Sequence, residues 1–494
     1  MPRTLSSPLV LLAALSSVLT VAGCAVGPDY VRPTVATPQN FKEAEGQWMQ
    51  VGNAEPAVPA EWWKVFKDNT LDELEAQVSI NNQNILVAAA QYRAARAAVD
   101  TADAAFYPKV TGTFSGTRAA NALVSNNNGT QSQGASAPTN TVSLGASASW
   151  ELDLWGELRR ASESANASYA ASAGDLAAAQ LSAQALLAQT YFQLRSTETQ
   201  LDLQNRTVEA YSRYLQITKN RLASGVASDL DVNNAESQLA TAKATASTLV
   251  LQRAQYEHAI ATLVGKTPSE FSLAPGSLPA QPATPQLVPS RWLVTRPDLV
   301  AAERRVAAAN AQIGVAKAAW FPTLTLSAGG GYRGSSMNDL LTLPHRYWSL
   351  GPALAATLFD GGARSAAVAS ATASYDQSVA TYRQTVLTAF QEVEDNLAAI
   401  RLGDEALQQR MLAAKAANRA RDIALNQYQA GVSDQLSVIT AQASALSADS
   451  TLIAARQNLL LAAVLLYKNT GKVGDTPVAG TGPQAAANRE TAPQ

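Results

Sequence analysis

Few residues in this sequence are suited to catalysis or to metal binding. The chain of 494 residues has only two histidines, His258 and His345, and a single cysteine, Cys24, at widely separated positions. Because zinc sites need several such ligands at close spacing, the sequence excludes an ordinary zinc centre. No nucleophile stands beside a base, and no carboxylate pair recurs at matched positions. We therefore expect no enzymatic activity and no cofactor other than a covalent lipid.

The sequence also lacks an excess of charge of one sign. Charged residues make up 15% of the chain, and 37 Lys+Arg stand against 39 Asp+Glu without a long basic run. A nucleic-acid partner is therefore not expected. The segment Gly329–Gly334 satisfies G-x-G-x-x-G, but the residues after it do not predict a helix. A dinucleotide-binding site is excluded on that ground.

The single cysteine follows a segment typical of export. Arg3 gives a basic start, Leu9 to Val21 is apolar, and small residues precede Cys24. This pattern resembles a bacterial lipoprotein signal, so residues 1–23 are predicted to be removed and Cys24 to carry acyl chains. Several acyl chains, at about 0.8 kcal/mol per buried methylene, give a stable membrane anchor. Ala25 stands where an aspartate marks retention in the inner membrane, which favours the outer membrane. An ordinary secretory signal with an incidental cysteine is the alternative.

The sequence contains an internal repeat. Three landmarks recur in the same order: Phe-Tyr-Pro before residue 109 and Phe-Pro before residue 323, Leu-Asp and Phe-Asp, and Gly-Val at 225 and 431. A proline-rich stretch from Pro275 to Pro289 separates the copies and cannot be a continuous helix. The predicted organisation is an N-terminal segment at 24–70, a first repeat at 71–265, a linker at 266–295, a second repeat at 296–471 and a flexible tail at 472–494.

Each repeat begins with a helix and continues with two strands. The helical stretches are Leu71 to Ala105 and Pro297 to Ala319. Residues then alternate between apolar and small polar side chains over 108–120, 140–155, 322–334 and 347–360. Strands of about ten residues with this alternation are typical of a membrane barrel with a wet lumen. A soluble sandwich with one wet face is the alternative.

Four strands are too few to close a membrane barrel. The smallest closed barrels use about eight strands, and an open edge in lipid leaves backbone groups unpaired. The chain is therefore predicted to oligomerise, and three copies would supply twelve strands.

A very long helical stretch follows each strand pair. Glu157 to Ala223 and Ala363 to Ala430 would each reach about 100 Å at 1.5 Å per residue. Regular charges exclude a transmembrane span for both, and their many alanines favour close packing as coiled coils. Each stretch breaks near a glycine, Gly225 or Gly431, and a second helix returns. The sequence therefore predicts two long helical hairpins.

Several segments together resemble the TolC-like outer membrane factor family, in its lipoprotein branch associated with RND-type drug efflux. They include Trp-Glu-Leu-Asp-Leu-Trp-Gly at 150–156, Arg-Pro-Asp-Leu-Val-Ala-Ala-Glu at 296–303 and Leu-Phe-Asp-Gly-Gly at 358–362. The resemblance spans nearly the whole mature chain. It implies a mixed α and β fold, in which a homotrimer forms a twelve-stranded outer-membrane β-barrel continuous with a long periplasmic α-helical barrel.

The resemblance also implies roles for the hairpin tips. Family members link an aspartate after the first tip glycine to a tyrosine before the second, and Asp231 and Tyr428 occupy those places. Asn234 and Thr440 would complete a polar constriction, whereas Ser433 and Thr440 depart from the charged residues of some members. The tip residues expected to contact a periplasmic adaptor are Arg221, Leu222, Gly225, Val226, Gly431 and Val432.

The function implied by the resemblance is passive conduction. An inner-membrane RND-type transporter and a periplasmic membrane-fusion adaptor would pass drugs and toxic or aromatic compounds to the channel, which is anchored in outer-membrane lipid and extends into the periplasm. Two alternatives stay open: a channel for protein secretion, and a structural lipoprotein that bridges periplasm and membrane.

Overall fold

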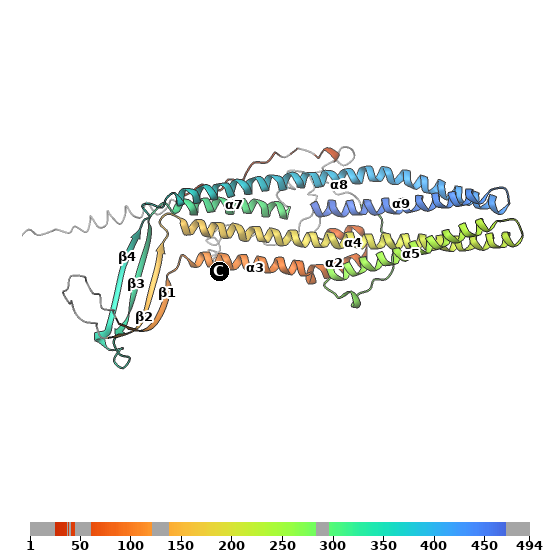
Figure 1. Cartoon of the computed structure of the whole chain (residues 1–494). Helices are drawn as coiled ribbons and strands as arrows, with labels where there is room; N and C mark the ends of the chain where they lie inside the picture. The colour runs from red at the N-terminus through yellow and green to blue at the C-terminus, as the bar shows by residue number, and fades with distance from the viewer. Residues whose placement is uncertain are drawn as a thin grey trace, which may run out of the picture. The chain divides into compact units, whose positions relative to one another are not determined.

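The computed structural model describes residues 25–36, 38, 41–44, 61–120, 138–282 and 296–470 (Figure 1). The chain divides into two compact units. Unit 1 contains the N-terminal stretch up to Pro33, Arg93–Tyr169 and Glu303–Ala380, and unit 2 contains the remainder. Each unit draws on both sequence repeats. The compact units are therefore not the repeats themselves, because equivalent elements of the two copies pack against each other.

Unit 1 contains a four-stranded antiparallel sheet in the order β1-β2-β3-β4. The strands are β1 (Lys109–Ala119), β2 (Thr139–Leu152), β3 (Thr323–Gly334) and β4 (Arg346–Ala355), and they lie side by side (Figure 1). The register joins the two repeats, because β2 of the first copy pairs with β3 of the second. Strands β1 and β4 are the two edges of the sheet.

One face of this sheet is apolar and exposed across all four strands. Paired residues share a face, so Phe114 aligns with Leu144 and Tyr332, and Leu324 aligns with Leu354. The exposed large apolar side chains on this face are Val110, Phe114, Leu144, Trp348, Leu350 and Leu354. The opposite face carries serine and threonine, and Ser115 and Ser143 hydrogen bond to each other there at 2.8 Å.

Glycines in β3 and β2 let the neighbouring strands and side chains of the sheet pack closely. A Cβ atom at Gly331 would lie 2.2 Å from the carbonyl oxygen of Leu144, and one at Gly145 would lie 2.5 Å from the hydroxyl of Tyr347. The Arg333 guanidinium lies 5.1 Å from the centroid of the Tyr347 ring. These glycines thus serve the packing of the sheet.

Two strands end earlier than the sequence predicts. The pattern predicts strands to residues 155 and 360, whereas β2 ends at Leu152 and β4 at Ala355. The reason is helix capping: Asp153 accepts hydrogen bonds from two amides at the start of α4 (Glu157–Ala223), and Asp360 accepts one from Arg364 in α8 (Ala363–Gln429). Each aspartate therefore belongs to the helix that follows it.

The helix expected from Leu71 to Ala105 is two helices, so that prediction is wrong. They are α2 (Asn69–Asn81) and α3 (Gln83–Ala104), and Asn82 separates them with ψ 121°. The Asn82 side-chain oxygen accepts from the amides of Asn84 and Ile85, and its amide donates to the carbonyl of Leu263 at 2.8 Å. Asn82 thus caps α3. The second repeat has one helix, α7 (Pro297–Ala318).

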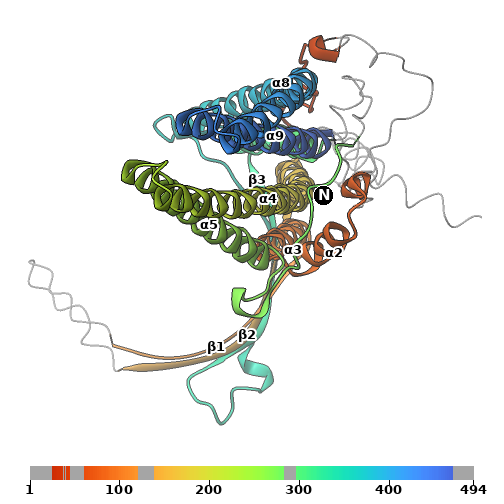
Figure 2. The same ribbon diagram turned by 90° about the vertical axis from the view of Figure 1, so that its right-hand side faces the viewer.

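Two long helical hairpins follow the strand pairs (Figures 1 and 2). Helix α4 turns into α5 (Asp229–Leu263), and α8 turns into α9 (Gln435–Thr470). Helix α9 is long and apolar enough to cross a membrane by composition alone. However, Leu460, Ala463 and Val464 are buried in the core of unit 2, which accounts for much of this apolar character.

An aromatic core at the base of the hairpins fixes the helices of unit 2. The short helix η3 (Trp62–Phe66) packs with α2, α4 and α9 in one cluster. The Phe66 and Phe192 ring centroids lie 4.8 Å apart, and Trp62 stacks on Tyr467 at 6.4 Å. Other short helices are η1 (Lys42–Ala44), η4 (Pro268–Glu270) and η5 (Leu343–His345).

Candidate functional site

Both hairpins turn by the same backbone geometry. Gly225 and Gly431 adopt φ of +73° and +75°, which side chains other than glycine rarely adopt. The amide of Val226 donates to the carbonyl of Arg221, and that of Val432 donates to the carbonyl of Gln427. This closing bond is that of a Schellman motif. Val226 and Val432 therefore project from equivalent positions, and they are 65% and 79% exposed.

The returning helices are capped by the same two residue types in opposite order. The Ser228 hydroxyl accepts from the amide of Asp231, and the Asp231 carboxylate accepts from the amide of Ser228 at 2.8 Å. In the second hairpin, Asp434 accepts from the amide and the hydroxyl of Ser437. These hydrogen bonds lower the pKa of Asp434. Asp231 is thus occupied in stabilising its own helix.

A small buried cluster holds the two hairpins together near their tips. We define this tip cluster as Tyr214, Ala235, Tyr428 and Val438, one residue from each of the four helices. The Tyr214 and Tyr428 ring centroids lie 5.6 Å apart. Burial raises the pKa of Tyr214, and the neighbouring Tyr428 raises it further, so the phenol is neutral at physiological pH.

Arg221 connects this cluster to the end of helix α8. Its Nη1 donates to the carbonyl oxygen of Tyr428 at 3.0 Å, and its guanidinium lies 4.5 Å from the centroid of the Tyr428 ring. The Gln435 amide donates to the carbonyl oxygen of Asp231 at 2.9 Å. Two hydrogen bonds and one cation–π contact therefore join the hairpins in addition to apolar packing.

The expected link between Asp231 and Tyr428 is not formed. In the described part of the chain no hydrogen bond joins their side chains, because Asp231 caps α5 and the Tyr428 ring packs in the tip cluster. Asn234 and Thr440 are exposed, and the Thr440 hydroxyl donates to Leu436 within its own helix. Within one chain, the aromatic and cationic contact at Tyr428 thus stands in place of the Asp231–Tyr428 link. A polar constriction formed by Asp231, Asn234 and Thr440 stays a prediction.

The structure adds residues that sequence reasoning missed. Tyr214 lies three helical turns before the tip glycine, and nothing in its local pattern marks it as a partner of Tyr428. Leu230 and Leu436, 68% and 67% exposed, extend the apolar surface of Val226 and Val432. The sequence could have indicated both leucines, because each stands at the same position relative to the residue that caps its helix. Leu222 is half-buried, and Arg221 turns toward Tyr428.

The residues after Cys24, which itself lies outside the described residues, form a strap on unit 1. The amide of Val26 donates to the carbonyl of Trp155 at 2.9 Å, and the buried Arg160 bonds Asp29 at 2.8 Å. A Cβ atom at Gly27 would lie 2.5 Å from the Cα of Gly314. The Val26 hydrogen bond thus holds the strap near the end of β2, and the close backbone contact of Gly27 holds it against α7.

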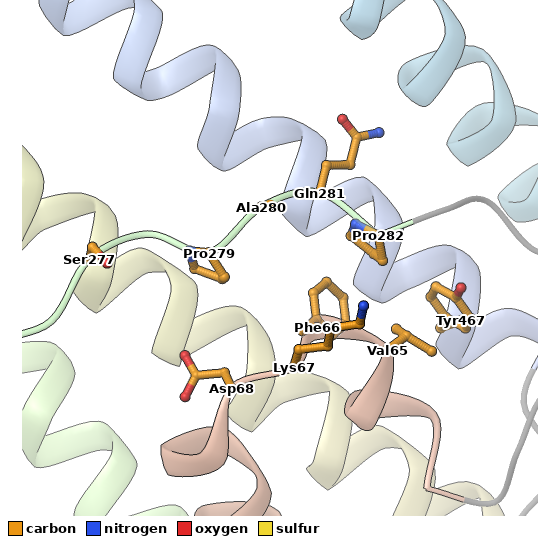
Figure 3. Close-up of a pocket in the computed structure, with 10 residues that line it drawn as sticks. All are labelled: Val65, Phe66, Lys67, Asp68, Ser277, Pro279, Ala280, Gln281, Pro282 and Tyr467. Atoms are coloured by element: carbon orange, nitrogen blue, oxygen red, sulfur yellow. The ribbon is translucent and has the colours of Figure 1, made fainter.

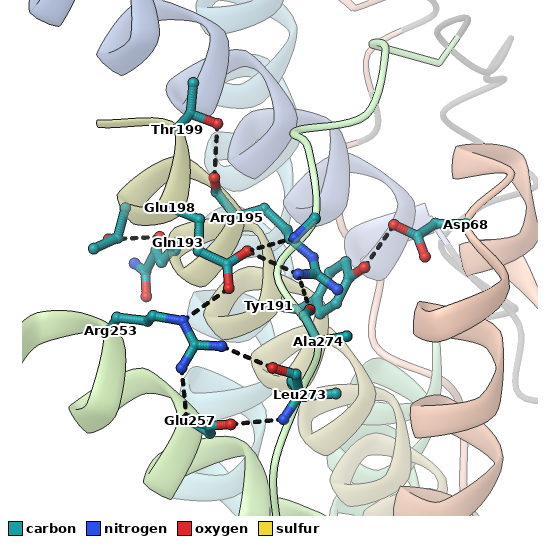
Figure 4. Close-up of polar contacts among 12 residues, drawn as sticks. Asp68, Tyr191, Gln193, Arg195, Glu198, Thr199, Arg253, Glu257, Leu273 and Ala274 are labelled. Carbon is teal, nitrogen blue, oxygen red and sulfur yellow. Dashed lines mark hydrogen bonds and ion pairs between the residues drawn. The ribbon is translucent and has the colours of Figure 1, made fainter. Parts of the chain in front are cut away.

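A buried ion network anchors the linker between the repeats (Figure 4). Glu198 of α4 pairs with Arg195 at 2.7 Å and with Arg253 of α5 at 3.0 Å. The two arginines donate to the carbonyl oxygens of Ala274 and Leu273 at 2.8 and 2.7 Å. The extended linker is therefore fixed to both helices of the first hairpin.

A groove of about 740 Å³ lies between this linker, η3 and α9 (Figure 3). Phe66, Tyr467 and two prolines form apolar walls, and Lys67 adopts φ +53° at the rim. The adjacent Asp68 accepts from the amides of Thr70 and Leu71 and from the Tyr191 hydroxyl. The groove thus has no nucleophile with a base. Among the described residues no group of histidine, cysteine and carboxylate side chains could hold a metal ion.

The sequence and the fold match known proteins over most of their length. The model of the outer membrane efflux protein family matches residues 75–266 and 288–472. The cation efflux system protein CusC of Escherichia coli is 30% identical over 449 residues, covering 90% of this chain and 92% of that protein. The pyoverdine export outer membrane protein OpmQ of Pseudomonas aeruginosa is 30% identical over 462 residues, covering 93% and 96%.

A third relative and two solved structures extend the similarity. The toluene efflux pump outer membrane protein TtgC of Pseudomonas putida is 31% identical over 470 residues, covering 93% of this chain and 95% of that protein. The outer-membrane channel OprN superposes with a TM-score of 0.81 at 32% identity, covering 91% of this chain and 99% of OprN. A CusC structure gives 0.77 at 26% identity, covering 91% and 100%.

Proposed function

The chain belongs to the outer membrane efflux protein family, and from this premise we propose that it is the outer-membrane channel of a tripartite efflux system. In this function the chain performs no chemistry. It conducts solutes that an inner-membrane RND-type transporter and a periplasmic adaptor deliver. The energy comes from the transporter, because nothing in the described residues suggests a nucleotide or catalytic site.

The exposed apolar face of the four-stranded sheet is the observation that carries this proposal. A large apolar face costs free energy in water, at about 25 cal/mol per Å². It is stable where lipid covers it. The edges β1 and β4 have unpaired backbone groups, which lipid cannot satisfy. Closing three copies edge to edge into a twelve-stranded barrel would pair both edges and leave the serine and threonine face toward a water-filled lumen.

The relatives support a small cargo rather than a polypeptide. Their names mention cations, pyoverdine and toluene at nearly the same identity to this chain. This spread favours efflux of small molecules over protein secretion. The exposed sheet face also argues against a structural lipoprotein, which has no use for two strand pairs.

The hairpin tips support docking to an adaptor. Val226, Leu230, Val432 and Leu436 form an exposed apolar surface at the turns. Four apolar side chains in that position suit a partner with complementary apolar residues. We include Gly225 and Gly431 because they shape the turns, and we assign Arg221 to the contact between hairpins instead.

The strap supports anchoring through an acylated Cys24. It holds Ala25 against Gly156, whose Cβ position lies 2.7 Å from the Ala25 side chain, close to where β2 ends. An acyl chain on the preceding residue would then start at the edge of the lipid-facing strands. Two or more acyl chains make such an anchor stable.

Conductance in planar bilayers tests the channel and its closure. We expect a small conductance for the full acylated protein and a larger one for an Arg221→Ala, Tyr428→Ala variant. The lost hydrogen bond and cation–π contact together contribute about 1–2 kcal/mol, which shifts the open-to-closed ratio by about tenfold.

Arg213→Ala is the matched control. Arg213 lies on the same helix and is exposed in a long ion pair with Glu209 at 3.5 Å, so its loss should leave the conductance unchanged. Absence of conductance from every variant, despite confirmed insertion, would exclude the channel. An equal increase for Arg213→Ala would exclude the assigned role of the tip contact.

A further inference from the structure

A glutamate is buried without partners in the aromatic core of unit 2. Glu75 lies on α2 and is 0% exposed, among the largest fully buried side chains of the described residues. Both of its carboxylate oxygens lack a hydrogen-bond partner in the part of the chain that the structure describes. Buried polar groups are nearly always hydrogen bonded, so this carboxyl group is an exception that needs an explanation.

In the described ranges, the elements around Glu75 offer its carboxyl group no counter-charge. On α2, the charge that acts on Glu75 is that of Asp72, which is also acidic. On η3, Lys64 pairs with Glu61 at 2.6 Å. Helix α4 contributes the Tyr191 hydroxyl, which donates to Asp68 at 2.7 Å, and α9 contributes the phenol of Tyr467. The Arg195 guanidinium of α4 lies 4.8 Å from the centroid of the Tyr191 ring but pairs with Glu198. Among the described residues, therefore, no cation pairs with the Glu75 carboxyl group.

An ionised carboxylate in this place is strongly unfavourable. Transfer of a charge from water into an apolar core costs more than any other side-chain burial, and the group takes up a proton instead. Burial raises the pKa of Glu75 well above its ordinary value, and the negative charge of Asp72 raises it further. The neutral acid is the form that fits the closed core.

We propose that Glu75 is a proton-binding site that makes the docking of helix α2 on α4 and α9 dependent on pH. With the proton bound, α2 packs closed. Without it, the carboxylate must reach water, and α2 has to move away from the core. This inference does not depend on the cargo or on the proposed channel function.

Two hydrogen bonds report whether α2 is docked. The Asp68 carboxylate accepts from the Tyr191 hydroxyl at 2.7 Å, and the Gln184 amide donates to the Ser79 hydroxyl at 3.1 Å. They join the two ends of α2 to α4. When α2 moves away from the core, both hydrogen bonds break, and the backbone amides of α2 become accessible to solvent.

The direction of the pH effect follows from proton linkage. The folded state binds the Glu75 proton more tightly than the unfolded state. At low pH the carboxyl group is protonated in both states, so its burial does not reduce the stability of the folded protein through ionisation. As the pH rises above the ordinary carboxyl value of about 4.5, only the unfolded state releases its proton freely, and stability falls until the folded pKa is reached. Within this window, the opening constant of α2 rises about tenfold per pH unit.

Hydrogen exchange of α2 in the full-length acylated protein, measured by mass spectrometry from about pH 5 to about pH 8 and corrected for intrinsic exchange, tests the proposal. We expect wild-type α2 to lose protection with rising pH. Glu75→Gln, which keeps the shape and removes the charge, should keep α2 protected throughout. The melting temperature of Glu75→Gln should likewise vary less with pH than that of the wild type.

Glu73→Gln provides the matched control, because Glu73 is exposed on the same helix. It should follow the wild type. Equal pH dependence of wild type and Glu75→Gln would overturn the proposal. Protection of wild-type α2 that increases with rising pH would also overturn it, since the ionised carboxylate would then be the stabilising form. The wild-type profile alone decides the matter should the variant not fold, because flat protection of α2 contradicts the proposal.

Discussion

At Gly27 there is no room for a Cβ atom. Its φ of +108° is one that other residues rarely adopt, and an added carbon would lie 2.5 Å from the Cα of Gly314. We predict that Gly27→Ala displaces the strap and destabilises unit 1 by about 2–3 kcal/mol. Limited proteolysis should show faster cleavage after residue 25, and the melting temperature should fall.

Gly361→Ala separates the backbone term from the steric term. Gly361 also lies in unit 1 and has φ of +62°, but nothing stands within 4 Å of its Cβ position. Only the conformational cost of about 1–2 kcal/mol applies there, and the strap should stay in place. Equal proteolysis of the two variants would contradict the close contact between Gly27 and Gly314.

Some residue roles could be predicted from the sequence and others could not. The tip glycines and their valines follow from local pattern, because helix termination needs only neighbouring residues. Tyr214 could not be found in this way, since its partner Tyr428 lies in the other repeat. Glu75 was hidden for a different reason: an acidic residue on a helix normally indicates a solvent-exposed face.

At the scale of elements, the two hairpins differ in what holds them at their bases. Counted from the tip glycine, Arg401 and Asp404 correspond to Arg195 and Glu198, and Arg401 pairs with Glu43 of η1. The positions of Arg253 and Glu257 are taken by Leu459 and Ala463. Each hairpin thus uses an arginine at the same position to bind a connecting segment, but only the first has a second arginine.

This network predicts a large effect of one substitution. Arg195→Ala leaves Glu198 with a single cation and removes the bond to the Ala274 carbonyl, and we expect a loss of about 3–5 kcal/mol. The linker between residues 271 and 282 should become accessible to protease. Thermal unfolding in detergent, followed by tryptophan fluorescence, measures the loss of stability.

Arg206→Ala is the comparison on the same helix. Arg206 pairs with Asp202 at 2.8 Å, but both side chains are more than two-thirds exposed. Its removal should cost less than about 0.5 kcal/mol. Similar melting temperatures for the two variants would show that the buried network contributes no more than a surface ion pair.

Element boundaries were predictable where one residue type decides them. The hairpin turns lie near the glycines that the sequence indicates, but the sequence pattern does not predict the helix break at Asn82. Asparagine stands in many helices without ending them, and Asn82 does so because its side chain also bonds the distant carbonyl of Leu263. A tertiary contact of this kind leaves no local signal.

At the scale of the whole molecule, the unpaired edges predict how copies meet. Ser115 of β1 and Ser349 of β4 lie on the serine and threonine face of the sheet. Within one chain these strands are three spacings apart, about 14 Å. A double Ser115→Cys, Ser349→Cys variant treated with a bis-maleimide of about 8 Å reach should therefore form products of two and three chains.

Each single-cysteine variant serves as the control and should give far less of the three-chain product. Cys24, if acylated as we propose, has no free thiol and would not react with the maleimide. A ladder that stops at two chains, or a product that forms only within one chain, would contradict closure by three copies. The sequence alone suggested oligomerisation from strand number. The strand order adds which two strands must face the neighbour, because it identifies β1 and β4 as the edges.

The swapped caps of the two returning helices also record the history of the molecule. One hairpin has serine followed by aspartate, and the other has aspartate followed by serine, at Ser228, Asp231, Asp434 and Ser437. Both residue types accept a bond from the third amide of a helix, so a duplicated half can pass from one order to the other by single substitutions without losing its cap. A letter-by-letter alignment of the halves counts two mismatches there. The relation between the two halves is therefore clearer from the hydrogen bonds that cap these helices than from the residues at the four positions.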